Sequence, residues 1–360
     1  MANIFCRSPF IVIINETNQI ETKVELFIWN GTGSAPTSPT YTISKLIPST
    51  SSRATYYNIS SYIKEFISHS SFQNTYNDST VEYDSLQWCN VKIKKYKKLT
   101  TTFSQVGSDL NYKSFDGYTL YTEDMNKDLG DYLLDEKTYY YYYDTPYNLD
   151  TDTLKRAGTI NWVASAGDKI KYTELSTGLS QTFTWGSAAV VSSYRVYPTY
   201  YDNGNKVEIL NSSNVVKWTA TFKPKTECHY EPVCCDFINR YGAWQREYFF
   251  KASKNNINVA NSEYNLLQGL SVFGGYQELE GQIKTFNTNY TETITVNTDW
   301  VSEDFSENLR QLMTSERILL DNRPVKLNTK SMEIFKQINT KMINYTLEFQ
   351  YANDIINNVI

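Results

Sequence analysis

The chain has 360 residues, of which 41% are hydrophobic and 20% charged, and its formal net charge is −5. This balance is that of a globular protein with more than one core, and it excludes a largely disordered chain. The densest basic stretch, residues 94–98, is too short to form the cationic face that nucleic acids require, so nucleic acid is not expected as the main partner. No apolar run reaches 18 residues and the start lacks a secretory pattern, so we expect no membrane span and assembly in a cytoplasm.

Aromatic residues are abundant, with 30 Tyr, 17 Phe and 7 Trp in the chain. Tyr, Thr, Ile and Val favour strands, and Asn, Ser and Thr are common in turns. The sequence therefore predicts a mainly β fold. We expect β-sandwich-like domains with two short helices and an extended arm or insertion.

Residues 1–98 predict an N-terminal β domain with one short helix. The helix is expected in YYNISSYIKEFI, residues 56–67, because its apolar side chains recur at spacings of three and four on one face. LQWCNVKIKKY, residues 86–96, alternates apolar and polar side chains and predicts a half-buried strand. The buried side would carry Cys89, Val91 and Ile93.

Residues 99–150 differ, because Thr, Ser, Asp, Gly and Tyr far outnumber aliphatic residues there. The segment is too long for a plain loop in a compact domain, so we expect a Tyr-rich arm or insertion. Within it lies KTYYYYYDTPY, residues 137–147. Neighbouring side chains in a strand point to opposite faces, so this run would present phenol rings on both faces at once.

The remaining sequence predicts two more domains. Residues 151–225 hold short strands separated by turn residues, which is typical of a second β-sandwich-like domain. Residues 226–360 predict a C-terminal β domain with one amphipathic helix in SEDFSENLRQLMTS, residues 302–315. The stretch KMINYTLEFQYA, residues 341–352, alternates strictly and predicts a strand with one buried face.

Residues with catalytic or metal-binding chemistry are sparse. The sequence lacks the motifs of phosphate-binding loops, zinc proteases and serine hydrolases, so no catalytic residue and no cofactor are predicted. One candidate zinc cluster lies in CHYEPVCC, although adjacent ligands in a strand would face opposite sides. A buried, inert set of small side chains is the favoured explanation of that stretch. The candidate ligands are Cys228, His229, Cys234 and Cys235.

Three explanations fit the tyrosine run. It could be a stacking platform for sugars, an aggregation-prone segment, or a strand covered on one face by its own core and on the other by a second subunit. We favour the interface, because Tyr is enriched where one chain meets another. For Tyr197, Tyr200 and Tyr201, an ordinary aromatic core is an equal alternative. The expected interface residues are Tyr139, Tyr140, Tyr141, Tyr142, Tyr143, Tyr147, Tyr197, Tyr200 and Tyr201.

Four segments carry a resemblance to known proteins. They are YYNISSYIKEFI at 56–67, FINRYGAWQREYFF at 237–250, NTDWVSEDFSENLRQLMTSERILL at 297–320 and PVKLNTKSMEIFKQINTKMINYTLEFQYA at 324–352. Each resembles a segment of virion structural proteins from phages of Bacteroidota hosts, including crAss-like phages. These are packing motifs, so they indicate a lineage better than a biochemical function. Residues 99–225 show no such resemblance.

The resemblance implies a tail, baseplate or hub component of the virion. Such a subunit would be non-enzymatic, would form a ring with copies of itself and would dock on neighbouring tail proteins. It would be located in the virion tail after assembly in the host cytoplasm. Ring subunits contact each other through two different patches, and obligate interfaces of this kind are large.

Two alternatives belong to other functional classes. The chain could be a fibre or capsid-decoration module whose Tyr-rich arm binds host glycans, and binding of capsule polysaccharide would distinguish it from a hub. A glycan hydrolase would need two facing carboxylates, and no such constellation stands out in the sequence.

Overall fold

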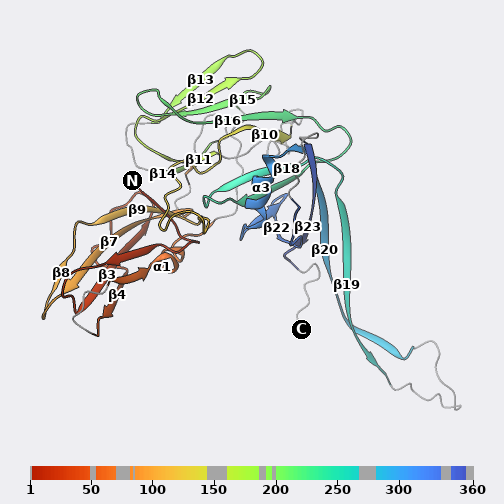
Figure 1. The fold of residues 1–360 in the computed structure, drawn as a ribbon. Helices are drawn as coiled ribbons and strands as arrows, with labels where there is room; N and C mark the ends of the chain where they lie inside the picture. The colour runs from red at the N-terminus through yellow and green to blue at the C-terminus, as the bar shows by residue number, and fades with distance from the viewer. Residues whose placement is uncertain are drawn as a thin grey trace. The chain divides into compact units, whose positions relative to one another are not determined.

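The computed structural model describes residues 2–48, 54–69, 82–83, 86–143, 160–185, 192–196, 200–266, 281–333 and 342–353 (Figure 1). The fold is mainly β, as predicted, with strands arranged in several sheets. Two short helices, α1 (Ser60–Lys64) and α3 (Phe305–Met313), occur in the described part, and both lie where helices are predicted.

The chain divides into two compact units. Unit 1 comprises Met1–Glu227 and Asp236–Tyr248, and unit 2 comprises Cys228–Cys235 and Phe249–Ile360. The chain passes from one unit to the other within β17 (Val233–Ile238) and near the end of β18 (Trp244–Phe249). The division into segments 1–98, 99–150, 151–225 and 226–360 stays a prediction.

The first sheet of unit 1 is one of two layers around a shared core. Its strand order is β1 (Asn3–Phe5), β9 (Leu110–Phe115), β7 (Trp88–Lys98), β3 (Glu21–Asn30) and β4 (Tyr41–Leu46), with β8 (Phe103–Gln105) paired to β7. The opposing layer consists of β2 (Ile11–Ile14), β5 (Thr55–Asn58) and α1. Val12, Tyr57 and Ile63 of this layer share a hydrophobic cluster with Leu26 and Val91 of the sheet. The alternation predicted for β7 is confirmed, because Cys89, Val91 and Ile93 are fully buried.

A five-stranded sheet occupies another part of unit 1. Its order is β10 (Lys137–Tyr143), β16 (Val216–Lys225), β15 (Asn205–Leu210), β12 (Lys169–Glu174) and β13 (Ser180–Thr184). A three-stranded sheet has the order β11 (Ile160–Ala164), β14 (Ser192–Val196) and β6 (Glu82–Tyr83). One face of the larger sheet is buried through alternate residues such as Ile170, Val207 and Trp218. The buried indole of Trp218 donates a hydrogen bond to the carbonyl oxygen of Leu134, 2.8 Å away.

Where it is described, the segment 99–150 contributes strands to two sheets of unit 1. Strands β8 and β9 pair with β7, and β10 pairs with β16, so these strands are parts of larger sheets. Polar side chains fix the stretch between β9 and β10 together with the buried Leu133 and Leu134. The amide of Asn126 exchanges hydrogen bonds of 2.7 and 2.8 Å with the backbone of Ile11, and Asn3 Nδ2 donates to Asp131 Oδ1 at 3.0 Å. Such polar anchors leave no apolar periodicity in the sequence, so they could not be predicted from it.

Unit 2 is built on one sheet. The strand order of this sheet is β18, β17, β21 (Ile318–Leu320), β22 (Arg323–Leu327), β23 (Met342–Tyr351), β20 (Ile283–Ser302) and β19 (Lys254–Asn265). The strict alternation predicted for the last strand of the chain is confirmed, because Ile343, Tyr345, Leu347 and Phe349 are buried in β23. Helix α3 buries Leu309 and Leu312.

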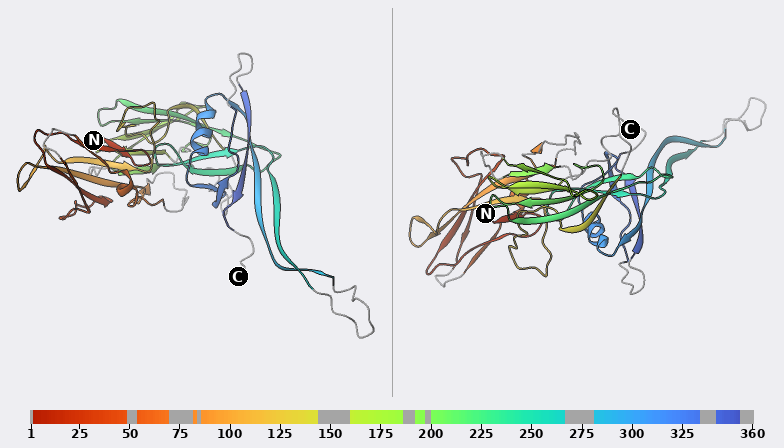
Figure 2. Two further views of the ribbon diagram at one scale, coloured as in Figure 1. Left: turned by 60° about the horizontal axis from the view of Figure 1, so that its bottom comes forward. Right: turned by 90° about the horizontal axis from the view of Figure 1, so that it is seen from above.

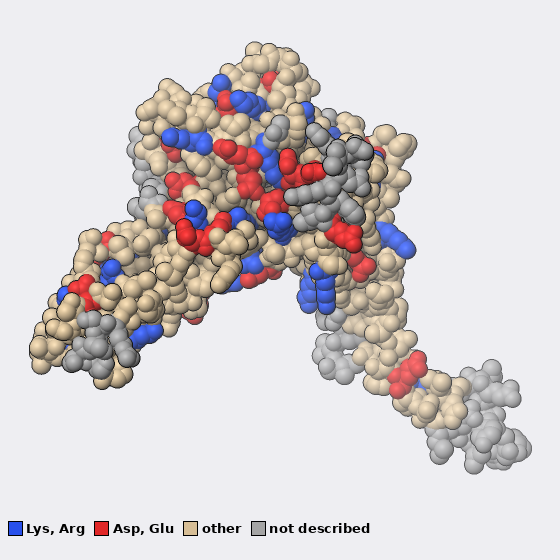
Figure 3. Space-filling view, viewed as in Figure 1, with Lys and Arg blue, Asp and Glu red and all other residues tan. Residues whose placement is uncertain are grey.

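The outer parts of β19 and β20 form a two-stranded ribbon that the sequence analysis does not predict. Strand β23 pairs with β20 only from Thr293 to Ser302. Among the described residues, the ribbon (residues 257–265 and 283–292) therefore pairs only with itself. Figures 1 and 2 show it extending well past the other strands of its unit. On the face drawn in Figure 3 its surface is almost entirely uncharged.

Candidate interface

Strand β10 places the tyrosine run at the edge of the five-stranded sheet. It pairs in parallel with β16, and the register sets Tyr140 opposite Phe222 and Tyr141 opposite Lys223. A register shift, typical of a β-bulge, lies between Lys137 and Tyr140. Among the described residues, no strand pairs with the other edge of β10. Strand β10 is therefore an edge strand of its sheet, and edge strands can accept a further strand.

The inward face of β10 belongs to the core of its own unit. Tyr140 and Tyr142 are 5% and 4% exposed. The Tyr140 ring stacks on Phe222 with a centroid distance of 5.1 Å, and its hydroxyl donates to the carbonyl oxygen of Asp135 at 2.9 Å. The Tyr142 hydroxyl donates to the carbonyl oxygen of Asp202 at 3.1 Å. Burial raises the pKa of Tyr140 well above its usual range, so this phenol remains a neutral hydrogen-bond donor.

The outward face combines aromatic rings with ammonium groups. Tyr139 is 44% exposed and stacks on the half-buried Tyr141, with centroids 6.4 Å apart. Lys223 Nζ lies 3.7 Å from the Tyr139 ring centroid, and Lys225 Nζ lies 5.9 Å from that of Tyr141. These four residues are called the tyrosine–lysine face. It offers flat apolar surface and positive charge, which suits binding rather than bond making or breaking.

The other predicted interface tyrosines divide into two groups. Tyr147 and Tyr197 lie outside the described residues. Tyr200 and Tyr201 are half-buried and their rings meet edge to face, with centroids 4.8 Å apart. Tyr200 also stacks on the buried Tyr172, 5.2 Å away. This aromatic cluster favours the core explanation for Tyr200.

The candidate zinc ligands are not arranged around one point. Cys234 and Cys235 are adjacent in β17 and both buried, so their side chains point to opposite faces of the strand. Cys228 and His229 lie in an exposed segment before β17. No three His, Cys, Asp or Glu side chains approach a metal-binding arrangement in the part of the chain that the structure describes.

A buried polar cluster, which the sequence analysis missed, joins three distant segments of unit 1. Asp116 Oδ2 lies 3.1 Å from His69 Nε2, and its Oδ1 lies 3.9 Å from Cys6 Sγ and 3.8 Å from Lys64 Nζ. The Asp116 carboxylate therefore contacts both the imidazole and the thiol. Burial and, to a smaller extent, the charge of Asp116 raise the pKa of the Cys6 thiol, and this opposes thiolate formation. The cluster is therefore a packing feature, and no sequence signal links its residues.

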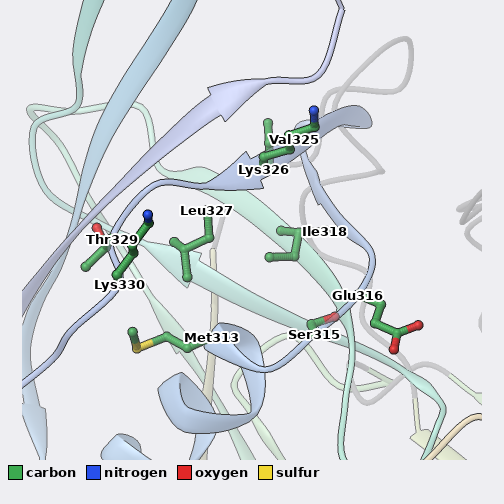
Figure 4. A pocket seen from close by; sticks show the side chains of 9 residues that line it. All are labelled: Met313, Ser315, Glu316, Ile318, Val325, Lys326, Leu327, Thr329 and Lys330. Atoms are coloured by element: carbon green, nitrogen blue, oxygen red, sulfur yellow. The ribbon is translucent and has the colours of Figure 1, made fainter. Parts of the chain in front are cut away.

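A half-open pocket of about 400 Å³ lies in unit 2, between the end of α3 and strands β21 and β22. Figure 4 shows Leu327 and Ile318 near its centre and Glu316, Lys326 and Lys330 around them. The remaining lining residues are Met313, Ser315, Val325 and Thr329. The Ser315 hydroxyl donates to the carbonyl oxygen of Arg317 at 2.9 Å. We assign this pocket no ligand.

Comparison with known proteins does not place the chain in a family. It matches no protein-family model and no curated protein. Among the described residues, the structure holds no helix that is long and apolar enough to cross a membrane.

Proposed function

We propose that the chain is a non-enzymatic structural subunit of a phage virion. In this proposal it is a tail or baseplate hub protein that forms a closed ring with copies of itself and docks on neighbouring tail proteins. The resemblance of four segments to phage virion proteins supports this lineage. The observation that carries the proposal is the tyrosine–lysine face on the open edge of β10.

The tyrosine–lysine face has properties expected of a subunit contact. Tyr supplies large, rigid contact area with a polar tip, and it is enriched at protein interfaces. Lys223 is already held over the Tyr139 ring, so less side-chain entropy is lost when a partner covers it. The opposite face of the same strand packs on its own core through Tyr140 and Tyr142. A strand between its own core and a neighbour accounts for tyrosine on both faces.

The cysteines support assembly in a reducing compartment. No disulfide joins Cys6, Cys89, Cys228, Cys234 and Cys235, all of which the structure describes, and four of them are buried. Proteins that fold in oxidising compartments more often pair such residues. The host cytoplasm, where phage virions assemble, is the compartment that the proposal requires.

The mass of the purified protein in solution tests the proposal. Light scattering at several concentrations should give a discrete closed oligomer, and Tyr139→Ser with Tyr141→Ser should shift it toward the monomer. Tyr121→Ser is the matched control, because Tyr121 is fully exposed and lies outside the tyrosine–lysine face. A monomer mass at every concentration would contradict ring formation, and equal effects of the two changes would contradict the role of the face.

A second candidate function is recognition of host glycans by a fibre or decoration module. The stacked rings of Tyr139 and Tyr141 favour it, because pyranose rings pack on aromatic faces. Titration with capsule polysaccharide, followed by tyrosine fluorescence, separates the two functions. Saturable binding that Tyr139→Ser abolishes would favour the glycan module, whereas a hub subunit should give no signal.

A further inference from the structure

The ribbon exposes apolar side chains that nothing among the described residues covers. Ile257, Val259, Ile283 and Phe286 are between 59% and 64% exposed. A two-stranded hairpin alone is at best marginally stable in water, and proteins usually protect open strand edges with charges or Pro. The ribbon contains no Pro, and its charged residues are Glu263, Lys284 and Glu292. Its composition is that of a surface covered in the assembled state.

We propose that the ribbon of one copy docks on the open edge of β10 in a second copy of this chain. In the described part, strands β19 and β10 are each the last strand of their sheets, and an edge strand can accept a further strand. Pairing two such edges joins them by backbone hydrogen bonds, as in other cases of strand addition. The inference rests on the proposed function, which supplies the reason for copies to meet.

The two edges match in length and in side-chain spacing. Strand β10 has 7 residues, a length of about 23 Å. Residues 257–265 of β19 extend over about 30 Å, so they can span it. Ile257 and Val259 recur at every second position, as do Tyr139 and Tyr141 on the outward face of β10. Pairs of aromatic and β-branched side chains across strands are among the favourable ones.

The area buried in a stable interface is larger than the tyrosine–lysine face alone can supply, so a second element must contribute to the contact. A stable interface buries about 800 Å² on each partner. The rings of Tyr139 and Tyr141 contribute at most about 250 Å² each. The ribbon supplies further apolar surface to the same contact without recruiting any part of the unit cores.

Charge favours β10 over a second ribbon as the docking site. The ribbon carries two carboxylates, Glu263 and Glu292, and one ammonium group, Lys284. The tyrosine–lysine face carries Lys223 and Lys225. Opposite charges meet in the proposed contact, whereas two ribbons would bring like net charges together. The contact joins two different patches, so each copy has one patch for each neighbour and the chain of contacts can close into a ring.

Three double variants test the proposal in the full-length chain. The ribbon variant is Ile257→Thr with Val259→Thr, and the edge variant is Tyr139→Thr with Tyr141→Thr. Thr keeps strand propensity while it removes apolar surface. Leu46→Thr with Leu179→Thr is the control, because both leucines are exposed and lie outside the ribbon and the tyrosine–lysine face. Circular dichroism and thermal melting confirm that each variant is folded before its mass is measured.

We expect the ribbon and edge variants each to raise the concentration needed for assembly by at least about tenfold, and the control to leave it unchanged. A mixture of the ribbon and edge variants retains one intact contact, so it should give a dimer and nothing larger. A ribbon variant that assembles like wild type would overturn this inference and leave the proposed function standing. A wild-type chain that is monomeric at every concentration would overturn the proposed function, and this inference with it.

Discussion

Lys223 and Tyr139 are stacked across two parallel strands, with the ammonium nitrogen 3.7 Å from the ring centroid. We expect Lys223→Met to lower the free energy of unfolding by about 0.5–1 kcal/mol, because a partly exposed cation–π contact is lost. Urea unfolding measures this change. Lys217→Met on the same strand is the control and should change stability by less than about 0.5 kcal/mol, since Lys217 is exposed. Equal effects of the two substitutions would show that the contact contributes nothing.

Arg246 and Asp236 form a buried bidentate ion pair in the β17–β18 hairpin. Arg246 Nε and Nη2 lie 2.7 and 2.8 Å from the two carboxylate oxygens, and Asp236 is fully buried. Arg246→Met leaves a buried carboxylate without this partner and should cost about 3–5 kcal/mol of stability. Adding Asp236→Leu should recover part of that loss in chemical denaturation. A double variant less stable than the single one would contradict the explanation. Arg310→Met, at an exposed ion pair with Glu307, should cost about 1 kcal/mol or less.

Lys113 gives stability a pH dependence with a defined sign. Burial lowers its pKa from 10.5 to about 8. Its Nζ lies 3.8 Å from the Trp88 ring centroid and donates to Asn90 Oδ1 at 3.1 Å. Between these two pKa values the folded chain has released the proton while the unfolded chain still holds it. The contribution of Lys113 to the free energy of unfolding should therefore rise as pH increases through this window.

Lys113→Met isolates this contribution from other titrating groups. Urea unfolding of wild type and variant at about pH 7.5 and about pH 10.5 measures it. We expect the difference in stability to move in favour of wild type as pH rises. A difference that stays constant across this range would show that Lys113 titrates alike in both states.

Gly242 should not tolerate a side chain. Its φ is +77°, and a Cβ there would lie 2.6 Å from backbone atoms of Asp116. Gly242→Ala should therefore destabilise the chain by more than the roughly 1–2 kcal/mol of the left-handed conformation alone. Gly178→Ala is the matched control, because Gly178 has φ +74° and a Cβ added there would meet no atom within 4 Å. Similar melting temperatures for the two variants would exclude the clash as a cause.

Periodicity in the sequence predicts the strands that bury one face. The alternations in β7 and β23 each predict which side chains are buried, because a sheet with one wet face imposes a period of two. The tyrosine run predicts a strand with rings on both faces, and the burial of Tyr140 and Tyr142 agrees with one face resting on its own core. The parallel partner β16 lies about 80 residues further along the chain, and local sequence carries no information on that pairing.

The strands of the ribbon could not be predicted from periodicity, because neither of their faces is buried in a core among the described residues. Its strands alternate Asn, Thr and Ser with scattered apolar residues, which resembles loop composition. Ile257 and Val259 lack a core to face, so the pattern that identifies other strands is weak there. The cluster of Asp116, His69 and Cys6 is likewise invisible, because its members come from separate segments and meet only in the folded chain.

The five consecutive tyrosines also affect how β10 finds its place during folding. A slip of one residue normally moves apolar side chains to the wrong face, and this penalty fixes the register of a strand. In β10 such a slip exchanges one phenol for another, so ring burial alone does not select the register. The register is therefore selected by two other features. One is the bulge after Lys137, and the other is the pair of hydrogen bonds from the Tyr140 and Tyr142 hydroxyls to the carbonyl oxygens of Asp135 and Asp202. Phe at either position would keep the ring and lose one of these bonds, so the preference of the strand for its observed register would weaken.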